Sequence, residues 1–134
     1  QRVTTRTLPD GTLYSQDNLL ITLEFANGSI GTVTYLANGN KGLGKEYLEV
    51  FGGGLSARLD DYRKMQIYDG KRSMKRVSRL RQDKGHAGEW RSIAAYLTGK
   101  GPVPISFEEI VNSTQATFAA QRSLQDGEPV SLQL

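Results

Sequence analysis

The stretch NLLITLEFANGSIGTVTYL, residues 18–36, decides the predicted fold class. Apolar residues occupy every second position of its first half: Leu19, Ile21, Leu23 and Phe25. This period of two is typical of a β-strand. The dipeptide Asn27-Gly28 then favours a two-residue hairpin turn, because both residue types accept a positive φ. The stretch therefore predicts two antiparallel strands joined by a tight turn.

Further strand-like runs lie on both sides of this hairpin. They are QRVTTRT at 1–7, KEYLEVF at 45–51, LSARLDD at 55–61 and KMQIYDGKRSMKRVS at 64–78. In the last of them, Asp69-Gly70 predicts a second hairpin turn. Because the links between successive strands are short, we expect a mainly antiparallel sheet.

Three consecutive glycines, Gly52–Gly54, raise the alternative of a phosphate-binding loop. Such a loop presents backbone N–H groups at a helix N-terminus, and a P-loop also needs a lysine followed by serine or threonine. The residues after these glycines alternate like another strand, and they include no lysine followed by serine or threonine. We therefore predict a tight turn between two strands and no nucleotide site.

The second half of the chain changes to a helical period. After His86, four residues lie at helical spacing: Trp90, Ile93, Ala94 and Leu97. The stretch from Gly99 to Pro102 ends this predicted helix. A second helix starts at Ser106, which forms a capping box with Glu109, and it ends at Asp126-Gly127. Its predicted packed face consists of Phe107, Val111, Thr114 and Phe118, with small residues at Ala116, Ala119 and Ala120.

These elements, with a short last strand in VSLQL, predict an α+β fold for residues 1–134 as a single domain. We expect an open, mainly antiparallel sheet with helices packed on one face. Leu20, Val33 and Tyr35 predict that the second face is also apolar, so it needs a partner of its own. The sequence therefore predicts a homodimer or a higher homo-oligomer through the sheet.

Composition bounds the function classes. The 134 residues have a net charge of +3 and a pI of about 9.3, and none of them is cysteine. The absence of cysteine excludes disulfides and thiolate metal sites and favours a cytoplasmic location. No apolar run is long enough to span a bilayer, so we expect no membrane partner. Because the first residue is Gln1 and the first methionine is Met65, we expect a piece of a longer protein.

The order of four segments resembles one known family: DNLLITLEFANGSIGTVTYLANG, KEYLEVFGGGLSARLDD, HAGEWRSIAAYLTG and PVPISFEEIVNSTQATFAAQRSLQDGEPVSL. Together they are similar to the C-terminal domain of the Gfo/Idh/MocA oxidoreductases. This family includes glucose–fructose oxidoreductase and inositol 2-dehydrogenase. The resemblance runs from Asp17 to Leu134, and the nearest members are longer, two-part oxidoreductases.

The resemblance implies an N-terminal Rossmann domain, absent from this chain, that binds NAD or NADP. The C-terminal domain would supply half of the pocket for a sugar, polyol or related hydroxyl compound, and its sheet would make the oligomer interface. Catalysis in the family depends on a lysine in Glu-Lys-Pro and on an Asp and a His of a preceding helix. None of these positions exists in this chain. We therefore predict no catalytic, cofactor-binding or metal-binding residue and no activity of the chain alone.

The candidate substrate-binding residues are donors near one glycine-rich loop, Ala37 to Glu46. They are Asn38, Asn40, Lys41 and Lys45, to which we add the only histidine, His86. Amide and ammonium groups suit a polyhydroxylated or acidic sugar, and the corresponding loop of the family lies towards the substrate. An exposed loop with ordinary surface lysines is an equal alternative. For His86 a structural role beside Trp90 is the alternative that we favour over proton transfer.

A basic cluster supports a different function: Lys71, Arg72, Lys75, Arg76, Arg79 and Arg81. It makes a non-enzymatic binding or scaffold domain for an anionic partner the alternative function. Alternation places these charges on both faces of a hairpin rather than along one stripe, and no nucleic-acid-binding motif accompanies them. A solvated edge hairpin explains the cluster without a ligand, so we expect no nucleic-acid partner.

Overall fold

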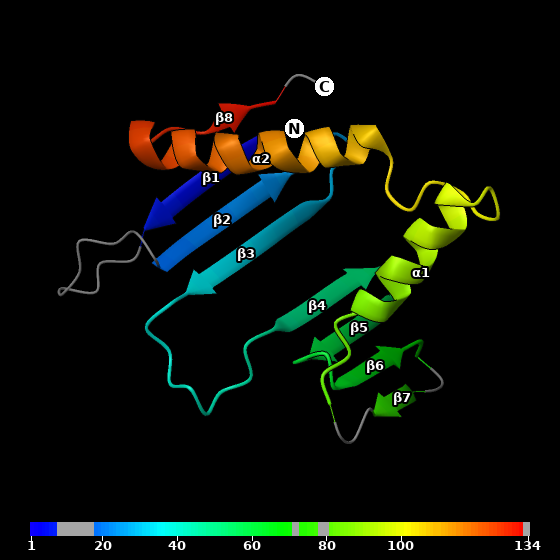
Figure 1. Ribbon diagram of the computed structural model, residues 1–134. Helices are drawn as coiled ribbons and strands as arrows, with labels where there is room; N and C mark the ends of the chain where they lie inside the picture. Colours follow the sequence, from blue (N-terminus) through cyan, green and yellow to red (C-terminus); the bar gives the residue numbers. More distant parts are fainter. Residues whose placement is uncertain (8–17, 71–72, 78–80, 133–134) are drawn as a thin grey trace. The chain divides into compact units, whose positions relative to one another are not determined.

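The computed structural model describes residues 1–7, 18–70, 73–77 and 81–132 (Figure 1). It confirms the α+β class and the antiparallel pairing of the strands. The described strands form two four-stranded sheets, however, where the sequence predicted one. The chain groups into two compact units, one of residues 1–39 and 105–134, the other of residues 40–104. The expectation of a single domain stays a prediction.

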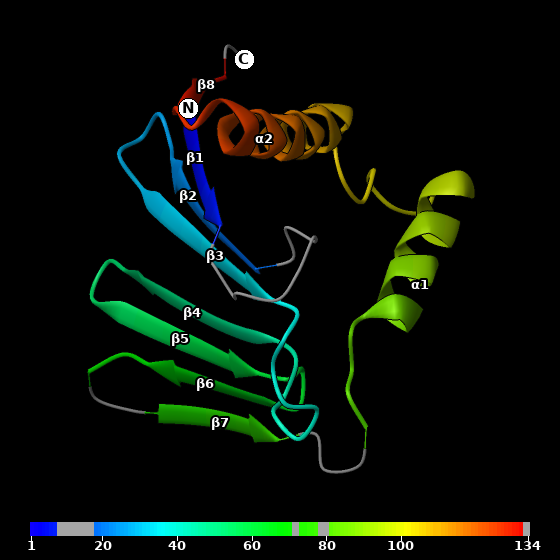
Figure 2. The same ribbon diagram turned by 90° about the vertical axis from the view of Figure 1, so that its left-hand side faces the viewer.

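The first unit contains a sheet in the order β3-β2-β1-β8. Its strands are β1 (Arg2–Thr7), β2 (Asn18–Glu24), β3 (Ile30–Leu36) and β8 (Val130–Ser131), and all neighbours are antiparallel. The helix α2 (Phe107–Asp126) lies along one face of this sheet (Figure 2). The last strand follows α2 and pairs with β1, which brings the first and the last described residues of the chain together.

The turn between β2 and β3 forms where Asn27-Gly28 predicted it, but with three loop residues rather than two. The carbonyl of Phe25 accepts the Gly28 N–H at 3.0 Å, and the Phe25 N–H donates to Ser29 at 2.9 Å. Gly28 alone takes a positive φ, of 84°, while the Asn27 side chain accepts the Ser29 N–H at 3.0 Å. This geometry is a type I turn followed by a glycine bulge.

Helix α2 has the predicted ends but not the predicted packed face. The capping box of Ser106 and Glu109 is present, and Gly127 ends the helix with a φ of 73°. The buried residues of α2 are Ala119 and Ser123, whereas Phe118 is 63% exposed. The prediction of a face built on Phe107 and Phe118 was therefore wrong. Small side chains let the helix approach β1 closely enough for Ser123 Oγ to accept the Thr5 N–H at 2.9 Å.

The second unit contains a meander in the order β4-β5-β6-β7. Its strands are β4 (Tyr47–Gly52), β5 (Leu55–Asp60), β6 (Lys64–Tyr68) and β7 (Ser73–Val77). Gly53 and Gly54 form the two-residue turn between β4 and β5, both with positive φ. This confirms the predicted strand-to-strand turn. Asp69-Gly70 precedes β7, and Gly70 has a φ of 80°.

Helix α1 (His86–Leu97) ends before Gly99, as predicted, but none of its residues is buried. Trp90, expected on a packed side, is 69% exposed. The expectation that both helices cover a sheet face therefore holds for α2 only. Helical period shows which side of α1 is apolar, but not what covers that side. Within the described residues, no helix is both long enough and apolar enough to cross a membrane.

Candidate functional site

The predicted binding loop is divided between the two units. Asn38 belongs to the first unit, whereas Asn40, Lys41 and Lys45 belong to the second. Asn40 holds a turn: its side-chain oxygen accepts the Gly42 N–H at 2.8 Å, and its carbonyl accepts the Leu43 N–H at 3.1 Å. Lys41 and Lys45 are both exposed. The loop therefore presents two ammonium groups, and Asn40 shapes the turn that carries them.

The base of this loop is held by Asp61, which is only 9% exposed. Asp61 Oδ1 accepts the main-chain N–H of Lys45 at 3.1 Å and the side-chain amide of Gln82 at 2.5 Å. Its other oxygen, Oδ2, pairs with Arg63 Nε at 3.4 Å. The main-chain N–H of Asp61 donates to the Glu46 carbonyl at 2.6 Å. Because its oxygens have donors, this nearly buried carboxylate is compensated.

The backbone at Asp61 is strained. Asp61 and Tyr62 have φ values of 48° and 53°, and the Arg63 N–H donates to the Asp60 carbonyl at 2.9 Å. Side chains other than glycine cost roughly 1–2 kcal/mol each in this left-handed region, so surrounding contacts must hold them there. Gly44 is one such contact: a Cβ on Gly44 would lie 3.2 Å from the Cβ of Asp61.

A third segment joins the same place. The Asp83 N–H donates to the Tyr62 carbonyl at 3.2 Å. Lys84 pairs with Glu46 at 3.5 Å and lies 5.7 Å from the centre of the Tyr62 ring. Residues 44–46, 61–63 and 82–84 are thus tied together, and we call them the Asp61 junction. The junction links the base of the glycine-rich loop at residues 37–46, the glycine loop, to the segment that leads into α1.

His86 is the first residue of α1, two residues after this junction. It is exposed, so the structural role beside Trp90 that we favoured from the sequence is not a buried one. Asp83 shapes the approach to the helix, because its side chain accepts the Gly85 N–H at 3.0 Å. The structure therefore ties the segments that carry Lys45 and His86 to one turn.

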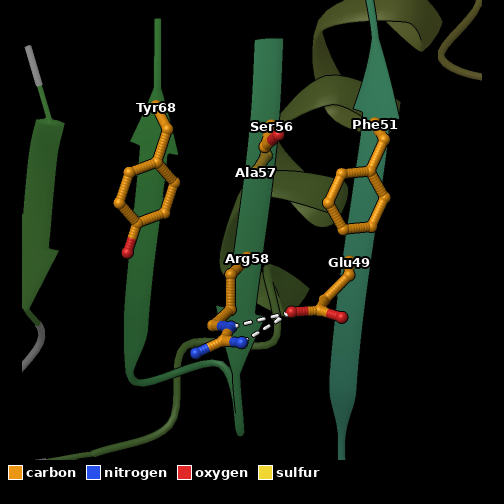
Figure 3. Close-up of a pocket in the computed structure, with 6 residues that line it drawn as sticks. All are labelled: Glu49, Phe51, Ser56, Ala57, Arg58 and Tyr68. Atoms are coloured by element: carbon orange, nitrogen blue, oxygen red, sulfur yellow. Dashed lines mark hydrogen bonds and ion pairs between the residues drawn. The ribbon is translucent and has the colours of Figure 1, made fainter. Parts of the chain in front are cut away.

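A second feature lies on one face of the β4–β7 sheet and was missed from the sequence. It is a hollow of about 320 Å³ lined by Glu49, Phe51, Ser56, Ala57, Arg58 and Tyr68 (Figure 3). Strand register builds it: Phe51 pairs with Ser56, which pairs with Tyr68, and Glu49 pairs with Arg58 in the next row. A small serine between two aromatic residues leaves the space.

The polar wall of the hollow is a compact network on one oxygen. Glu49 Oε1 accepts Arg58 Nε at 3.0 Å, Arg58 Nη2 at 2.7 Å and the Tyr47 hydroxyl at 2.6 Å. The guanidinium carbon of Arg58 lies 5.4 Å from the centre of the Tyr47 ring. The shared hydrogen bonds hold the arginine in one orientation and pair the two charges with each other.

The same hydrogen bonds shift three pKa values. The bond from Tyr47, followed by those from Arg58, lowers the pKa of Glu49. The bond to Glu49 is the main cause of the raised pKa of the Tyr47 hydroxyl and of the raised pKa of Arg58. At neutral pH the glutamate and arginine are therefore both charged and the tyrosine is neutral. Because these groups face solvent, the network contributes orientation rather than much stability.

The described part of the chain shows neither a metal centre nor the complete basic cluster. Those residues contain no group of three histidine, cysteine, aspartate or glutamate side chains that could hold a metal ion. Of the basic cluster, Lys71, Arg72 and Arg79 lie outside the described residues, while the backbone of Lys75 and Arg76 forms part of β7. The alternative function that depends on this cluster stays a prediction.

Comparison with known proteins shows similarity at the level of structure. No protein-family model and no curated protein matches the sequence. The fold is similar to the crystal structure of an oxidoreductase from Agrobacterium radiobacter in complex with NAD+, L-tartaric acid and magnesium. The TM-score is 0.74 at 16% sequence identity, over 97% of this chain and 42% of that one. The chain therefore has the fold of one part of an oxidoreductase and spans less than half of its length.

Proposed function

We propose that this chain is the C-terminal, substrate-binding part of an NAD(P)-dependent oxidoreductase of the Gfo/Idh/MocA type. The observation that carries the proposal is the fold shared along 97% of the chain with an oxidoreductase that was crystallised with NAD+. That protein is more than twice as long as the matched region, which leaves room for a separate cofactor domain.

The cofactor belongs to that other domain because residues in this chain do not fit it. A dinucleotide site needs glycines between a strand and the N-terminus of a helix. Gly52–Gly54 instead joins β4 to β5, and α1 begins after Gly85 without a glycine-rich loop. We therefore assign NAD or NADP to a Rossmann domain outside the chain, and catalytic groups with it.

The glycine loop is our candidate for the substrate side of the pocket. Lys41 and Lys45 supply ammonium donors that bind hydroxyl and carboxylate oxygens, and His86 supplies an imidazole near the same junction. The substrate class is a sugar, a polyol or a related hydroxy acid. The L-tartaric acid in the similar oxidoreductase is of this class, since it carries two hydroxyl groups between two carboxylates.

The Asp61 junction supports this assignment. A loop that binds a small substrate gains affinity when its donors are positioned before binding. Asp61 holds the main chain of Lys45 and Glu46 directly, and Lys84 holds the Glu46 side chain. The strained turn at Asp61 and Tyr62 is thus used to position a loop that carries charged donors.

We also propose a homodimer through the open face of the β1–β3 sheet. Register places Leu20, Ile30 and Leu36 on one face, and Val33 and Tyr35 on the other with Ile21. The prediction that put Leu20, Val33 and Tyr35 on a common second face was therefore wrong. Ile30 and Leu36 are exposed, and helix α2 covers the face of Val3 and Thr5. A second copy would cover the apolar residues that α2 leaves open.

Titration of the isolated chain tests the functional assignment. We expect L-tartrate and myo-inositol to shift the backbone amide signals of residues 40–46 in NMR spectra, and Lys41→Ala with Lys45→Ala to weaken the tartrate shifts. Lys100→Ala, outside the loop, is the matched control. NADH should give no change in nicotinamide fluorescence at micromolar concentrations. Binding of NADH by this chain alone would contradict the assignment of the cofactor to another domain. Unaltered tartrate shifts in the double variant would exclude the glycine loop as the substrate-binding segment.

A further inference from the structure

We propose that the hollow on strands β4, β5 and β6 binds a neutral sugar ring, stacked on Phe51 and Tyr68 and hydrogen-bonded by Arg58 and Glu49. The proposal does not rest on the oxidoreductase assignment, because it uses a different set of side chains. It concerns a site on the sheet face, whereas the glycine loop lies at the end of the strands.

The apolar part of the hollow fits one ring. Phe51 and Tyr68 stand two strands apart, which is roughly 10 Å, with only Ser56 between them. Figure 3 shows the two aromatic rings on either side of Ser56 and Arg58. Phe51 is 73% exposed and Tyr68 is 41% exposed, so ring surface is available for the C–H groups of a sugar. The volume of about 320 Å³ is at the small end for ligand sites.

The polar part selects for hydroxyl groups. Glu49 Oε1 takes three hydrogen bonds, while Glu49 Oε2 and Arg58 Nη1 take part in none within the described residues. One free acceptor and one free donor therefore lie at the two outer ends of a pair whose orientation is already set (Figure 3). Two separated hydroxyl groups of one sugar ring match them, because one hydroxyl can donate to the carboxylate while the other accepts from the guanidinium.

The charge of the hollow favours a neutral sugar over an anionic ligand. The positive charge of Arg58 is compensated by Glu49 at 2.7 Å, so the hollow offers no uncompensated charge to a phosphate or carboxylate. Acidic ligands would also approach the free oxygen of Glu49, which repels them. A neutral polyhydroxylated ring keeps both hydrogen bonds without this cost.

The area of the sheet face favours a sugar over a second copy of the chain as the occupant of the hollow. Four strands of five or six residues present a face of roughly 20 by 20 Å, or about 400 Å². A standard interface buries about 800 Å² on each partner, about twice that value. The hollow is therefore suited to a ligand of one ring rather than to a stable dimer on this face alone.

NMR titration with methyl β-D-glucopyranoside tests the proposal. We expect saturable shifts of the Ser56, Arg58 and Tyr68 amides with a millimolar Kd, and weaker shifts with the acyclic polyol D-mannitol. Phe51→Ala should raise the Kd about fivefold, since a stacking contact of about 1 kcal/mol is lost. Arg58→Met should raise it further. Val50→Ala is the matched control on the opposite face of β4 and should leave the Kd unchanged.

Three outcomes would overturn the proposal. One is the absence of saturable shifts in the wild-type chain. Another is a stronger response to L-tartrate or inorganic phosphate than to the glucoside at these amides, which would show an anion site. The last is self-association that broadens the same signals without sugar and disappears in Phe51→Ala, which would show that a second copy occupies the face. The first two outcomes come from titrations of the wild-type chain, so they test the proposal even if a variant fails to fold.

Discussion

The carboxylate of Asp61 accepts the main-chain N–H of Lys45 at 3.1 Å, although 16 residues separate them in the sequence. The contact joins the turn between β5 and β6 to the glycine loop before β4. It explains how two residues other than glycine keep a positive φ at this turn. It also places a lysine of the proposed substrate loop on a fixed part of the backbone.

Substitutions at Asp61 should lower the free energy of unfolding by amounts that depend on whether each keeps the hydrogen-bond acceptor and whether it relieves the backbone strain. Asp61→Asn keeps an oxygen acceptor and tolerates the left-handed backbone, so we expect the smallest loss of unfolding free energy. Asp61→Gly loses the acceptor but removes the strain, and Asp61→Ala loses the acceptor and keeps the strain. We expect Asp61→Ala to cost about 2–4 kcal/mol, and about 1 kcal/mol more than Asp61→Gly. Urea unfolding measures the ranking; equal losses in Ala and Gly variants would contradict a strained turn.

Amide hydrogen exchange gives a local readout of the same junction. In Asp61→Ala we expect faster exchange at the Lys45 amide, since its acceptor is gone. The Gly42 amide, held by Asn40 within the loop, serves as the internal control and should change little. Unchanged exchange at Lys45 would mean that Asp61 does not order the loop.

Ser123→Ala should destabilise the first unit. Ser123 is fully buried and its hydroxyl oxygen is the acceptor of the Thr5 N–H. Removing the hydroxyl leaves a buried donor unpaired, which costs about 1–3 kcal/mol. Ser113→Ala on the exposed side of α2 is the control and should be neutral or slightly stabilising. Thermal unfolding with equal melting temperatures in the two variants would contradict the role of Ser123.

The capping box at the start of α2 should depend on pH. The backbone N–H of Ser106 and then its side chain bind Glu109, and they lower the pKa of that carboxyl. A lowered pKa in the folded state adds stability above the ordinary pKa of glutamate, and this stability is lost as pH falls through the lowered pKa. NMR titration should show the Glu109 pKa rising towards its ordinary value in Ser106→Ala. An unchanged pKa would show that the Ser106 hydroxyl does not contribute to the lowered pKa of Glu109, since the backbone N–H of residue 106 stays in place.

The proposed dimer is tested by charge on each face of β3. We expect wild-type protein at micromolar concentration to sediment at twice the chain mass of 14.8 kDa or at a multiple of it. Ile30→Glu, on the open face, should shift it to the monomer with unchanged circular dichroism. Val33→Glu introduces the same charge on the opposite face and should leave the oligomer intact. Dissociation by Val33→Glu alone would move the interface to the other face.

Local chemistry made several features predictable. Strand period and turn residues identified the hairpins, and the Ser106–Glu109 pair marked the start of α2 correctly. The hollow could have been found in the same way. A two-residue turn at Gly53–Gly54 pairs Glu49 with Arg58, and the alternation of KEYLEVF places Phe51 on the same face. Only the register across β5 to Tyr68 needed a second turn to be known.

The sequence by itself thus determined the elements, the places of the turns and the ends of α2, because neighbouring residues decide backbone conformation. It predicted the turn length correctly for β4 and β5 but one residue too short for β2 and β3. Tertiary structure alone decided the division of the strands into two sheets and the choice of Ala119 and Ser123 over Phe118 as the buried side of α2. It also decided the joining of Lys45, Asp61 and Gln82. These features depend on how closely distant segments can approach and on which donors then bind a buried carboxylate. Periodicity along the chain predicts neither the distance between segments nor the partners of the carboxylate.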